Sequence, residues 1–383
     1  MPDTPSEHTN KLTVLQALPA LEIGGVERGT LEVAAALVRR GHRSIVISAG
    51  GRLEKKLLAE GSEHITLPIG RKSPFTFRHV AGVRKILAGE NISILHARSR
   101  LPAWICYLAW KTLPFDTRPL FVTTFHGPYS PGLYSRIMIR GERVIAVSEY
   151  IRKYMLRCYP DIDENKISVI LRGVSCNEYN QDFRPDRAWL TEWYKQYPHL
   201  RDKYIISLPG RISRRKGHED FIRIIAALES DNINVHGLII GEPHESNIKY
   251  YAQICRRVSD LGLDKHITFL GYRNDVREIL SLSNIVLSLS KEPEAFGRTV
   301  LETLYLGTPV IAYDIGGTTE IMNEIFPAGI VTHGDTEEVC NKIKMFMDKP
   351  PCVSAYYPFT LENMLDSTIR LYEKLAHKQA QDN

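Results

Sequence analysis

The chain has 383 residues, enough for two domains with ordinary cores. With 43% hydrophobic and 24% charged residues and no low-complexity tract, it is neither a disordered nor a fibrous sequence. The net charge of +5 is uneven, because residues 1–180 carry 25 Lys and Arg against 16 Asp and Glu, a net +9, and the remainder carries −4. A basic half is typical of a protein that faces an anion, although solvated surface charge explains it equally well.

Hydropathy and cysteine spacing argue against a membrane-spanning protein and against a protein stabilised by disulfide bonds. No apolar run reaches the roughly 18 residues that a bilayer span needs, and the polar, acidic residues 1–10 do not resemble a signal peptide. The six cysteines show neither CxxC nor metal-ligand spacing, which favours reduced thiols. We therefore expect a cytoplasmic protein.

Apolar runs typical of buried strands alternate with helical patterns along the first half of the chain. A strand at 11–19 precedes a helix at 27–41, in which apolar residues recur at i, i+3, i+4 and i+7 from Leu31 and Gly41 suits the C-terminal cap. Further strands are expected at 43–48, 92–97, 120–127, 143–148 and 167–174.

The alternation restarts after a polar, proline-punctuated stretch at 175–203, which we interpret as a linker. The later strands are expected at 204–210, 234–241, 267–271, 285–290, 309–314 and 328–333, before a last helix at about 361–379. This pattern predicts the α/β class, with two Rossmann-like doubly wound domains that face one another across a cleft. We place the first domain at 1–180 with a crossing helix at about 358–383, and the second at 181–357.

Two common nucleotide motifs are missing: there is no GxxxxGK[ST], and no GxGxxG follows the first strand. The first strand instead runs into Gly24 and Gly25. Paired glycines let an anion approach the amides at a helix N-terminus, although Gly-Gly turns are equally common without a ligand.

The second domain opens with a basic loop in "LPGRISRRKGHEDFI", residues 208–222. Arg211 and Lys216 flank Arg214 and Arg215 at the expected carboxyl end of a strand, where parallel sheets bind ligands. A solvated basic loop is the simple interpretation. A bound diphosphate explains the crowding better, because guanidinium and ammonium groups neutralise its charge without a metal.

A second segment, "EPEAFGRTVLE" at 292–302, carries Glu294 and Glu302 around the start of a helix. Carboxylates accept hydrogen bonds from sugar hydroxyls. Glu294 could therefore bind hydroxyls of a donor sugar, and Glu302, expected about two turns into its helix, could bind a ribose diol. Each glutamate alone would instead be interpreted as a helix cap or a surface residue. The amides expected to meet phosphate oxygens lie around Phe296, Gly297, Arg298 and Thr299.

Glu294 and Glu302, within "EPEAFGRTVLETLYLGTPVIAYDIGGTTEI", resemble the motif of glycosyltransferase family 4, which are retaining enzymes of the GT-B fold. The segments "GGVERGTL", "FHG", "VILRGV", "GRISRRKGHEDFI" and "ITFLGYRNDV" follow in the family's order and cover nearly the whole chain. The resemblance implies a nucleotide-sugar donor and a glycan or lipid-linked acceptor. A UDP-sugar is favoured over a GDP-sugar as the donor.

The resemblance also implies roles for single residues. Arg211 and Lys216 would hold the diphosphate, Glu294 the transferred sugar and Glu302 the ribose. His126 would face the reacting sugar, and Tyr272 would lie against the base. Gly24 and Gly25 match a first-domain loop near the phosphates and the acceptor. Arg298 stands where many members have an aliphatic residue, so only its backbone is given a role.

Neither a cofactor nor a catalytic metal is expected. Asp161 and Asp163 in "DID" imitate a metal-binding DxD motif, but they lie in a polar turn before a strand. In the retaining transfer that the resemblance implies, the departing phosphate could take the acceptor's proton, so no separate base is expected. The resemblance places His126, Arg211, Lys216 and Glu294 in the catalytic set.

The acceptor is expected at Arg98 and Arg100, before a Trp-rich apolar helix, although core packing of Trp104 and Trp110 is an equal alternative. The basic half and these aromatic residues fit peripheral contact with an anionic membrane and a role in bacterial lipopolysaccharide or other surface-polysaccharide synthesis. A sugar-nucleotide epimerase and a non-catalytic sugar-nucleotide-binding subunit remain alternatives. Nucleic acid is not expected as a partner, because the basic residues are dispersed.

Overall fold

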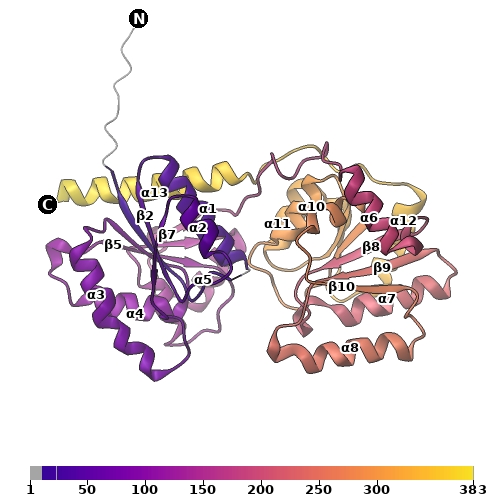
Figure 1. Cartoon of the computed structure of the whole chain (residues 1–383), viewed down its shortest axis with the longest axis horizontal. Coiled ribbons are helices and arrows are strands. Elements are labelled where there is room, and N and C mark those ends of the chain that lie inside the picture. Colours follow the sequence, from indigo (N-terminus) through magenta and orange to yellow (C-terminus); the bar gives the residue numbers. More distant parts are fainter. Residues whose placement is uncertain (1–10, 23, 383) are drawn as a thin grey trace, which may run out of the picture. The chain divides into compact units, whose positions relative to one another are not determined.

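The computed structural model describes residues 11–22 and 24–382, so the polar N-terminal residues 1–10 lie outside the described part of the chain. The chain divides into two compact units. Unit 1 runs to Leu171 and includes the segment from Glu362 onward, and unit 2 runs from Arg172 to Leu361. Figure 1 shows each unit as a sheet with helices on both sides.

In the described part of unit 1, seven parallel strands form one sheet in the order β3-β2-β1-β4-β5-β6-β7. The strands are β1 (Thr13–Ala17), β2 (Arg43–Ser48), β3 (Glu63–Thr66), β4 (Ile94–Ala97), β5 (Leu120–Phe125), β6 (Arg143–Ala146) and β7 (Ile167–Val169). The helices are α1 (Gly25–Arg39), α2 (Glu54–Ala59), α3 (His79–Gly89), α4 (Arg100–Lys111), α5 (Glu149–Cys158) and α13 (Leu361–Asp382), with 3-10 helices η1 (Pro74–Arg78), η2 (Phe115–Thr117), η3 (Ser135–Ile139) and η4 (Glu164–Lys166).

In unit 2 the described residues form six parallel strands in the order β10-β9-β8-β11-β12-β13. The strands are β8 (Tyr204–Pro209), β9 (Val235–Ile240), β10 (Ile267–Gly271), β11 (Ile285–Ser288), β12 (Val310–Tyr313) and β13 (Ile330–Val331). The helices are α6 (Arg187–Gln196), α7 (His218–Ser230), α8 (Ile248–Asp260), α9 (Val276–Leu282), α10 (Arg298–Tyr305), α11 (Gly317–Ile325) and α12 (Thr336–Asp348), with 3-10 helices η5 (Pro198–Leu200), η6 (Arg214–Lys216), η7 (Glu245–Asn247) and η8 (Pro327–Gly329).

The predicted fold class, α/β with two Rossmann-like parallel-sheet domains, is confirmed. Strands such as β1 and β8 are covered on both faces, and their largely apolar sequences, which include Gln16 and Ser207, are almost completely buried. The apolar stripe of α1 contributes Leu31 and Ala34 to a buried cluster with Val46 of β2. Burial of each leucine of this kind stabilises the fold by about 2 kcal/mol.

Two elements differ from the expectation. Strand β3 was not predicted, because Glu63–Thr66 is a short edge strand without a fully buried residue and therefore lacks an apolar run. The stretch 175–203, which we interpret as a linker, contains a helix that was not predicted, α6 at Arg187–Gln196. The Asp186 side chain caps this helix, and Trp189 Nε1 donates to Asp275 Oδ2 at 2.8 Å, so α6 packs onto unit 2.

The last helix, α13, is grouped with unit 1 although it follows unit 2 in the chain. Tyr372 lies within hydrogen-bond distance of His96 on β4, with Oη 2.6 Å from Nδ1, and Gln379 Nε2 donates to the Arg118 carbonyl at 3.1 Å. No helix of the described residues combines the length and apolar character that crossing a membrane requires.

Candidate active site

The candidate site of unit 2 lies where the strand order reverses. Strands β8 and β11 are neighbours, but the chain continues outward from β8 to β9 and from β11 to β12. The loops that leave the carboxyl ends of two such strands diverge, and parallel sheets bind ligands in the crevice between them. The predicted basic loop follows β8 and the predicted glutamate loop follows β11, so both reach this position.

Glycines shape the end of each loop. Gly217 precedes α7 with φ +72°, and Gly297 precedes α10 with φ +101°, a left-handed conformation that disfavours other residues. A Cβ at Gly217 would collide with the carbonyl oxygen of Leu289, and one at Gly297 would lie 2.7 Å from the Thr318 hydroxyl. Gly217 therefore permits close packing of the basic loop on the segment after β11, and Gly297 permits the close approach of α11 to the start of α10.

Three contacts join the basic loop to the glutamate loop. The Lys291 amide donates to the Arg215 carbonyl at 2.7 Å, and Arg215 Nε lies 3.1 Å from a carboxylate oxygen of Glu292. Lys216 Nζ forms an ion pair with Glu294. The structure thus brings together Lys216 and Glu294, which lie 78 residues apart in the sequence.

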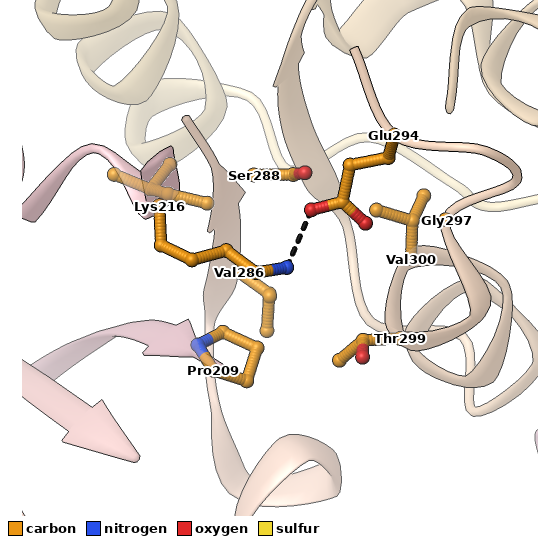
Figure 2. Close-up of a pocket in the computed structure, with 9 residues that line it drawn as sticks. Pro209, Lys216, Val286, Ser288, Glu294, Gly297, Thr299 and Val300 are labelled. Carbon is orange, nitrogen blue, oxygen red and sulfur yellow. Dashed lines mark hydrogen bonds and ion pairs between the residues drawn. The ribbon is translucent and has the colours of Figure 1, made fainter. Parts of the chain in front are cut away.

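Figure 2 shows the Lys216 and Glu294 side chains pointing toward one another in a small pocket. The Ser290 hydroxyl also donates to Glu294 Oε1, at 2.6 Å. Burial alone would raise the pKa of Glu294, but the charge and hydrogen bond of Lys216, the Ser290 hydrogen bond and the charge of Arg215 together lower it below its ordinary value. Glu294 is therefore a carboxylate, which accepts hydrogen bonds and does not donate a proton.

The pocket also includes the start of α10, whose N-terminus has no side-chain cap. Uncapped amides in the first turn of a helix attract an anion. The lining residues are Pro209, Lys216, Val286, Leu287, Ser288, Glu294, Gly297, Thr299 and Val300. The pocket therefore combines an ammonium group, a helix N-terminus and a carboxylate.

Glu302 and Arg298 form a pair inside α10. The Arg298 Nε lies 3.2 Å from Glu302 Oε1, and the Glu302 side chain is only 8% exposed. Glu302 is therefore not a surface residue, and it lies one turn into its helix, not two as predicted. Its pairing gives the Arg298 side chain a contact that the sequence did not indicate.

The remaining predicted residues of unit 2 do not line this pocket. Arg211 is exposed and has no hydrogen bond or ion pair with the described residues. Tyr272 follows β10 and is 43% exposed, outside the pocket lining. Phe296 is buried and packs edge-on against Phe359, with ring centroids 5.9 Å apart, so its side chain belongs to the core.

In unit 1 the predicted residues follow three neighbouring strands at one edge of the sheet. Gly24 and Gly25 begin α1 after β1, Arg98 and Arg100 follow β4, and His126 follows β5 and is half-buried. Strands β1 and β4 again mark the point where the strand order reverses.

The expectation that Arg98 contacts the acceptor requires correction. Its side chain is buried, and Nε donates to Gln16 Oε1 at 2.8 Å. Gln16 in turn donates to the Thr30 carbonyl, so Arg98 links β4 to β1 and α1. Arg100 is partly accessible, but its guanidinium lies over the Tyr129 and Tyr134 rings, 4.8 and 5.2 Å from their centroids.

The two tryptophans of α4 make internal contacts. Trp104 Nε1 donates to the Tyr134 carbonyl at 2.9 Å, and Trp110 Nε1 donates to the Pro119 carbonyl at 2.7 Å. Trp110 also stacks with Tyr107. These contacts favour the packing alternative for both side chains.

The two aspartates of "DID" have structural partners. Asp161 forms an ion pair with Arg136, and Asp163 caps η4 by accepting from the Asn165 amide at 2.9 Å. Among the residues described, no group of three or more His, Cys, Asp or Glu side chains has an arrangement suited to a metal ion.

Sequence reasoning missed a buried network beside the site. The Asp220 carboxylate on α7 is fully buried, accepts from the Tyr313 hydroxyl at 2.7 Å and pairs with Lys291 and Arg223. Since Lys291 opens the glutamate loop, this network anchors that loop to α7. A signal was present, because Asp220 shares one helix face with Ile224 and Leu228, an apolar stripe in which a carboxylate needs a partner.

Replacing Asp220 with asparagine should produce a pH-dependent loss of stability. Burial alone would raise the pKa of Asp220, but hydrogen bonds from Lys291, Tyr313 and Arg223 together lower it. The carboxylate therefore stabilises the fold above its unfolded pKa of about 3.9, and this contribution is lost as pH falls through the folded value. Urea unfolding of Asp220→Asn should show a deficit of about 2 kcal/mol at neutral pH that narrows below about pH 4.

The exposed Asp116 provides the control for this experiment. Asp116→Asn should leave the free energy of unfolding within about 0.5 kcal/mol of the original at either pH. A deficit of Asp220→Asn that stays constant over the whole range would contradict the assigned network.

Comparisons with known proteins identify the family. Residues 23–178 match the model described as Glycosyltransferase Family 4, and residues 191–356 match Glycosyl transferases group 1. The crystal structure of a glycosyltransferase from Rickettsia africae ESF-5 has a TM-score of 0.82 and 32% identity, covering 96% of this chain and 99% of that chain.

Two further proteins extend the comparison. N-acetyl-alpha-D-glucosaminyl L-malate synthase of Bacillus anthracis is 25% identical, over 83% of this chain and 81% of its own. Anabaena Alr3699/HepE, in complex with UDP and glucose, shares the fold with a TM-score of 0.75 and 18% identity, covering 97% of this chain and 99% of that chain. From the sequence matches and the two parallel-sheet units, the chain belongs to the glycosyltransferases and has the GT-B fold.

Proposed function

We propose that this glycosyltransferase is a retaining hexosyltransferase that moves a sugar from a nucleotide diphosphate sugar to a glycan or glycolipid acceptor. The observation that carries the proposal is the ion pair of Lys216 and Glu294 at the start of α10, in a pocket at the strand reversal of unit 2. One small site offers groups for phosphate and for sugar hydroxyls, which a nucleotide sugar needs together.

Charge decides how the donor would bind. The exposed Arg211, the Lys216 ammonium and the first-turn amides of α10 would hold the diphosphate. Glu294 stays ionised, so it would accept hydrogen bonds from hydroxyls of the transferred sugar. Lys216 would then contact both Glu294 and a phosphate oxygen, which keeps the pair neutralised when the donor enters.

The second glutamate would bind the ribose. Arg298 Nε lies 3.2 Å from Glu302 Oε1 and orients this carboxylate, which would accept hydrogen bonds from the ribose hydroxyls. Tyr272, exposed after β10, remains our candidate for contact with the base.

The chemistry follows from the charge that develops during transfer. The bond from the anomeric carbon to the phosphate oxygen breaks, leaving a cation-like sugar and negative charge on the diphosphate. Arg211, Lys216 and the helix amides stabilise that charge. The acceptor hydroxyl attacks from the same face, and its proton passes to the departing phosphate oxygen, so the anomeric configuration is retained.

Unit 1 would supply the acceptor side. His126 and the Gly24–Gly25 turn lie at the carboxyl edge of its sheet, where they are proposed to face the reacting sugar and the phosphates. Arg100 remains a candidate acceptor contact, whereas Arg98 would act only through its support of β1 and β4.

For the donor we propose a UDP-sugar, which is supported by the fold similarity to a protein crystallised with UDP and glucose. For the pathway we propose synthesis of lipopolysaccharide or another surface polysaccharide, at the cytoplasmic face of a membrane. The chain is also similar to N-acetyl-alpha-D-glucosaminyl L-malate synthase, so a small hydroxy acid such as L-malate is a second acceptor to test.

A panel of UDP- and GDP-sugars tests the function. Thermal shift should detect one preferred donor, and hydrolysis of that donor should release the nucleoside diphosphate; a saturating ligand raises stability by about 2.7 kcal/mol at a hundredfold excess over Kd. Proton NMR of the glycosylated product should show the donor's anomeric configuration. Donor consumption without any acceptor, yielding an isomerised sugar, would favour an epimerase, and the absence of any shift would contradict the proposal.

Chelation of divalent metals should not stop the reaction. Because cationic side chains and helix amides are assigned to the diphosphate, EDTA is expected to change the initial transfer rate by less than about twofold. The measurement is release of nucleoside diphosphate with and without EDTA. Loss of activity that added Mg²⁺ or Mn²⁺ restores would show that a metal is required.

A further inference from the structure

We propose that residues 71–85 of unit 1, here named the aromatic–basic segment, bind the surface of an anionic lipid bilayer. This inference rests on the proposed function for its purpose, which is to bring the enzyme to a lipid-linked acceptor. The binding itself is argued from the segment's own charge and exposure.

The first observation is a run of cations that lacks counter-charges. From residue 64 to residue 89 the chain has no Asp or Glu. The five basic side chains in this run are all exposed, and none forms an ion pair with the residues the structure describes; they are Arg71, Lys72, Arg78, Arg84 and Lys85. Elsewhere in unit 1, Arg40, Arg43 and Arg152 are neutralised by carboxylates.

The second observation is the exposure of two aromatic rings among these cations. Phe75 is 78% exposed and Phe77 is 46% exposed, whereas Thr76 between them is 3% exposed. The Ser73 hydroxyl accepts from the Phe75 amide at 3.3 Å, and the Thr76 hydroxyl donates to the Arg71 carbonyl at 2.5 Å. The turn is therefore held by its own hydrogen bonds, and both rings face outward from it.

The third observation is the orientation of α3, which packs against α4 (Figure 1). Its apolar side chains Val83 and Leu87 are buried. Arg78, just before the helix, and Lys85 are seven residues apart and exposed, so they lie on the opposite, outer face. The residues exposed between and beside them are small or basic, so no acidic side chain interrupts this face.

A bilayer surface accounts for both kinds of side chain. Phenylalanine rings enter the boundary between headgroups and acyl chains, and Arg and Lys remain among the lipid phosphates. Two rings are too small for a stable protein interface, which needs more than about 1,000 Å² of buried surface. A nucleic acid would match the charges, but the segment has no recognised nucleic-acid-binding motif to accompany its phenylalanines.

The place of the segment in the fold relates it to the acceptor side. It follows β3, so the chain enters it from the carboxyl edge of the sheet of unit 1. Gly24, Gly25 and His126 follow strands of the same sheet at the same edge. A membrane held by this segment would therefore meet the edge of unit 1 at which the acceptor is proposed to bind.

The test is co-sedimentation of the full-length protein with sucrose-loaded vesicles. Binding is expected to vesicles of seven parts phosphatidylcholine to three parts phosphatidylglycerol and to be at least about tenfold weaker with pure phosphatidylcholine. Phe75→Ala/Phe77→Ala should reduce binding to the anionic vesicles at least about tenfold, because two exposed rings leave the interface. Arg84→Gln/Lys85→Gln should reduce it as well and weaken its dependence on salt.

Phe115→Ala is the matched control, because Phe115 is 79% exposed on unit 1 but lies beside Asp116. It should bind as the original protein does. Equal binding by Phe75→Ala/Phe77→Ala and the original, or an equal loss in Phe115→Ala, would overturn the proposal. So would binding to an RNA oligonucleotide in the absence of vesicle binding.

The same variants separate this inference from the proposed function. Phe75→Ala/Phe77→Ala should retain the thermal midpoint of the original protein and hydrolyse the soluble donor at an unchanged rate. Vesicle binding is measured without any donor, so an absence of vesicle binding contradicts only the proposed membrane-binding segment. An absence of any effect of the nucleotide sugars contradicts only the proposed transferase function.

Discussion

Replacing Arg211 with alanine should lower the transfer rate by about 10²–10³-fold and leave the fold nearly unchanged. The expected loss corresponds to removing one preorganised cationic donor from the developing charge on the diphosphate. The side chain is exposed and has no partner among the described residues, so its removal should change the free energy of unfolding by less than about 0.5 kcal/mol. Initial rates with a saturating donor and urea unfolding measure the two quantities.

Arg214 is the matched control, since it is an exposed arginine of the same loop with other contacts. Its guanidinium lies over the Tyr250 ring at 4.8 Å and donates to Gln253 Oε1 at 2.8 Å, both on α8. Arg214→Ala should therefore keep most of the activity. If both variants lost activity equally, general charge attraction and not a diphosphate contact by Arg211 would explain the loss.

The second large effect is expected at Lys216, where the effects of substitution on stability and on activity should be distinguishable. Lys216→Met removes the cation that neutralises Glu294, whose side chain is only 19% exposed. The remaining carboxylate keeps the Ser290 hydrogen bond and the charge of Arg215 but loses its ion-pair partner, so we expect a loss of about 2 kcal/mol of stability and at least about 10²-fold in rate.

The double variant Lys216→Met/Glu294→Gln distinguishes the two effects. It contains no unpaired buried charge, so most of the lost stability should return, whereas transfer should remain at least about 10²-fold reduced because the diphosphate contact is still missing. Recovery of both stability and activity would mean that Lys216 serves only to neutralise Glu294.

Sequence patterns were sufficient for the elements whose signal is local. Apolar runs predicted β1 and β8, because a strand covered on both faces needs a largely apolar sequence. The same logic failed for β3 and α6. Glu63–Thr66 is a short sheet edge, and α6 buries little more than Trp193, so the sequence of each resembles a surface segment.

The candidate site was predictable where motif position was enough. Lys216 and Glu294 were both assigned to the donor from the sequence, and the structure brings them into contact. Arg98 and Glu302 show the limit. Both charged side chains are buried. The partner of Arg98 is Gln16, which is distant in the sequence, and the partner of Glu302 is Arg298, one helical turn away. No spacing rule in the sequence distinguishes a solvated charged side chain from one buried with such a partner.

The amino-acid order by itself determined the strand–helix alternation, the family and the residues that follow each strand, because these depend on local periodicity and on motifs read along the chain. Tertiary structure alone decided which charges are paired. Asp220 acquires Lys291 and Tyr313, and Glu294 acquires Lys216 and Ser290, only after parallel strands bring separate loops to one edge of the sheet. The energy of a charge depends on its partners and its exposure to water, and both are properties of the folded chain.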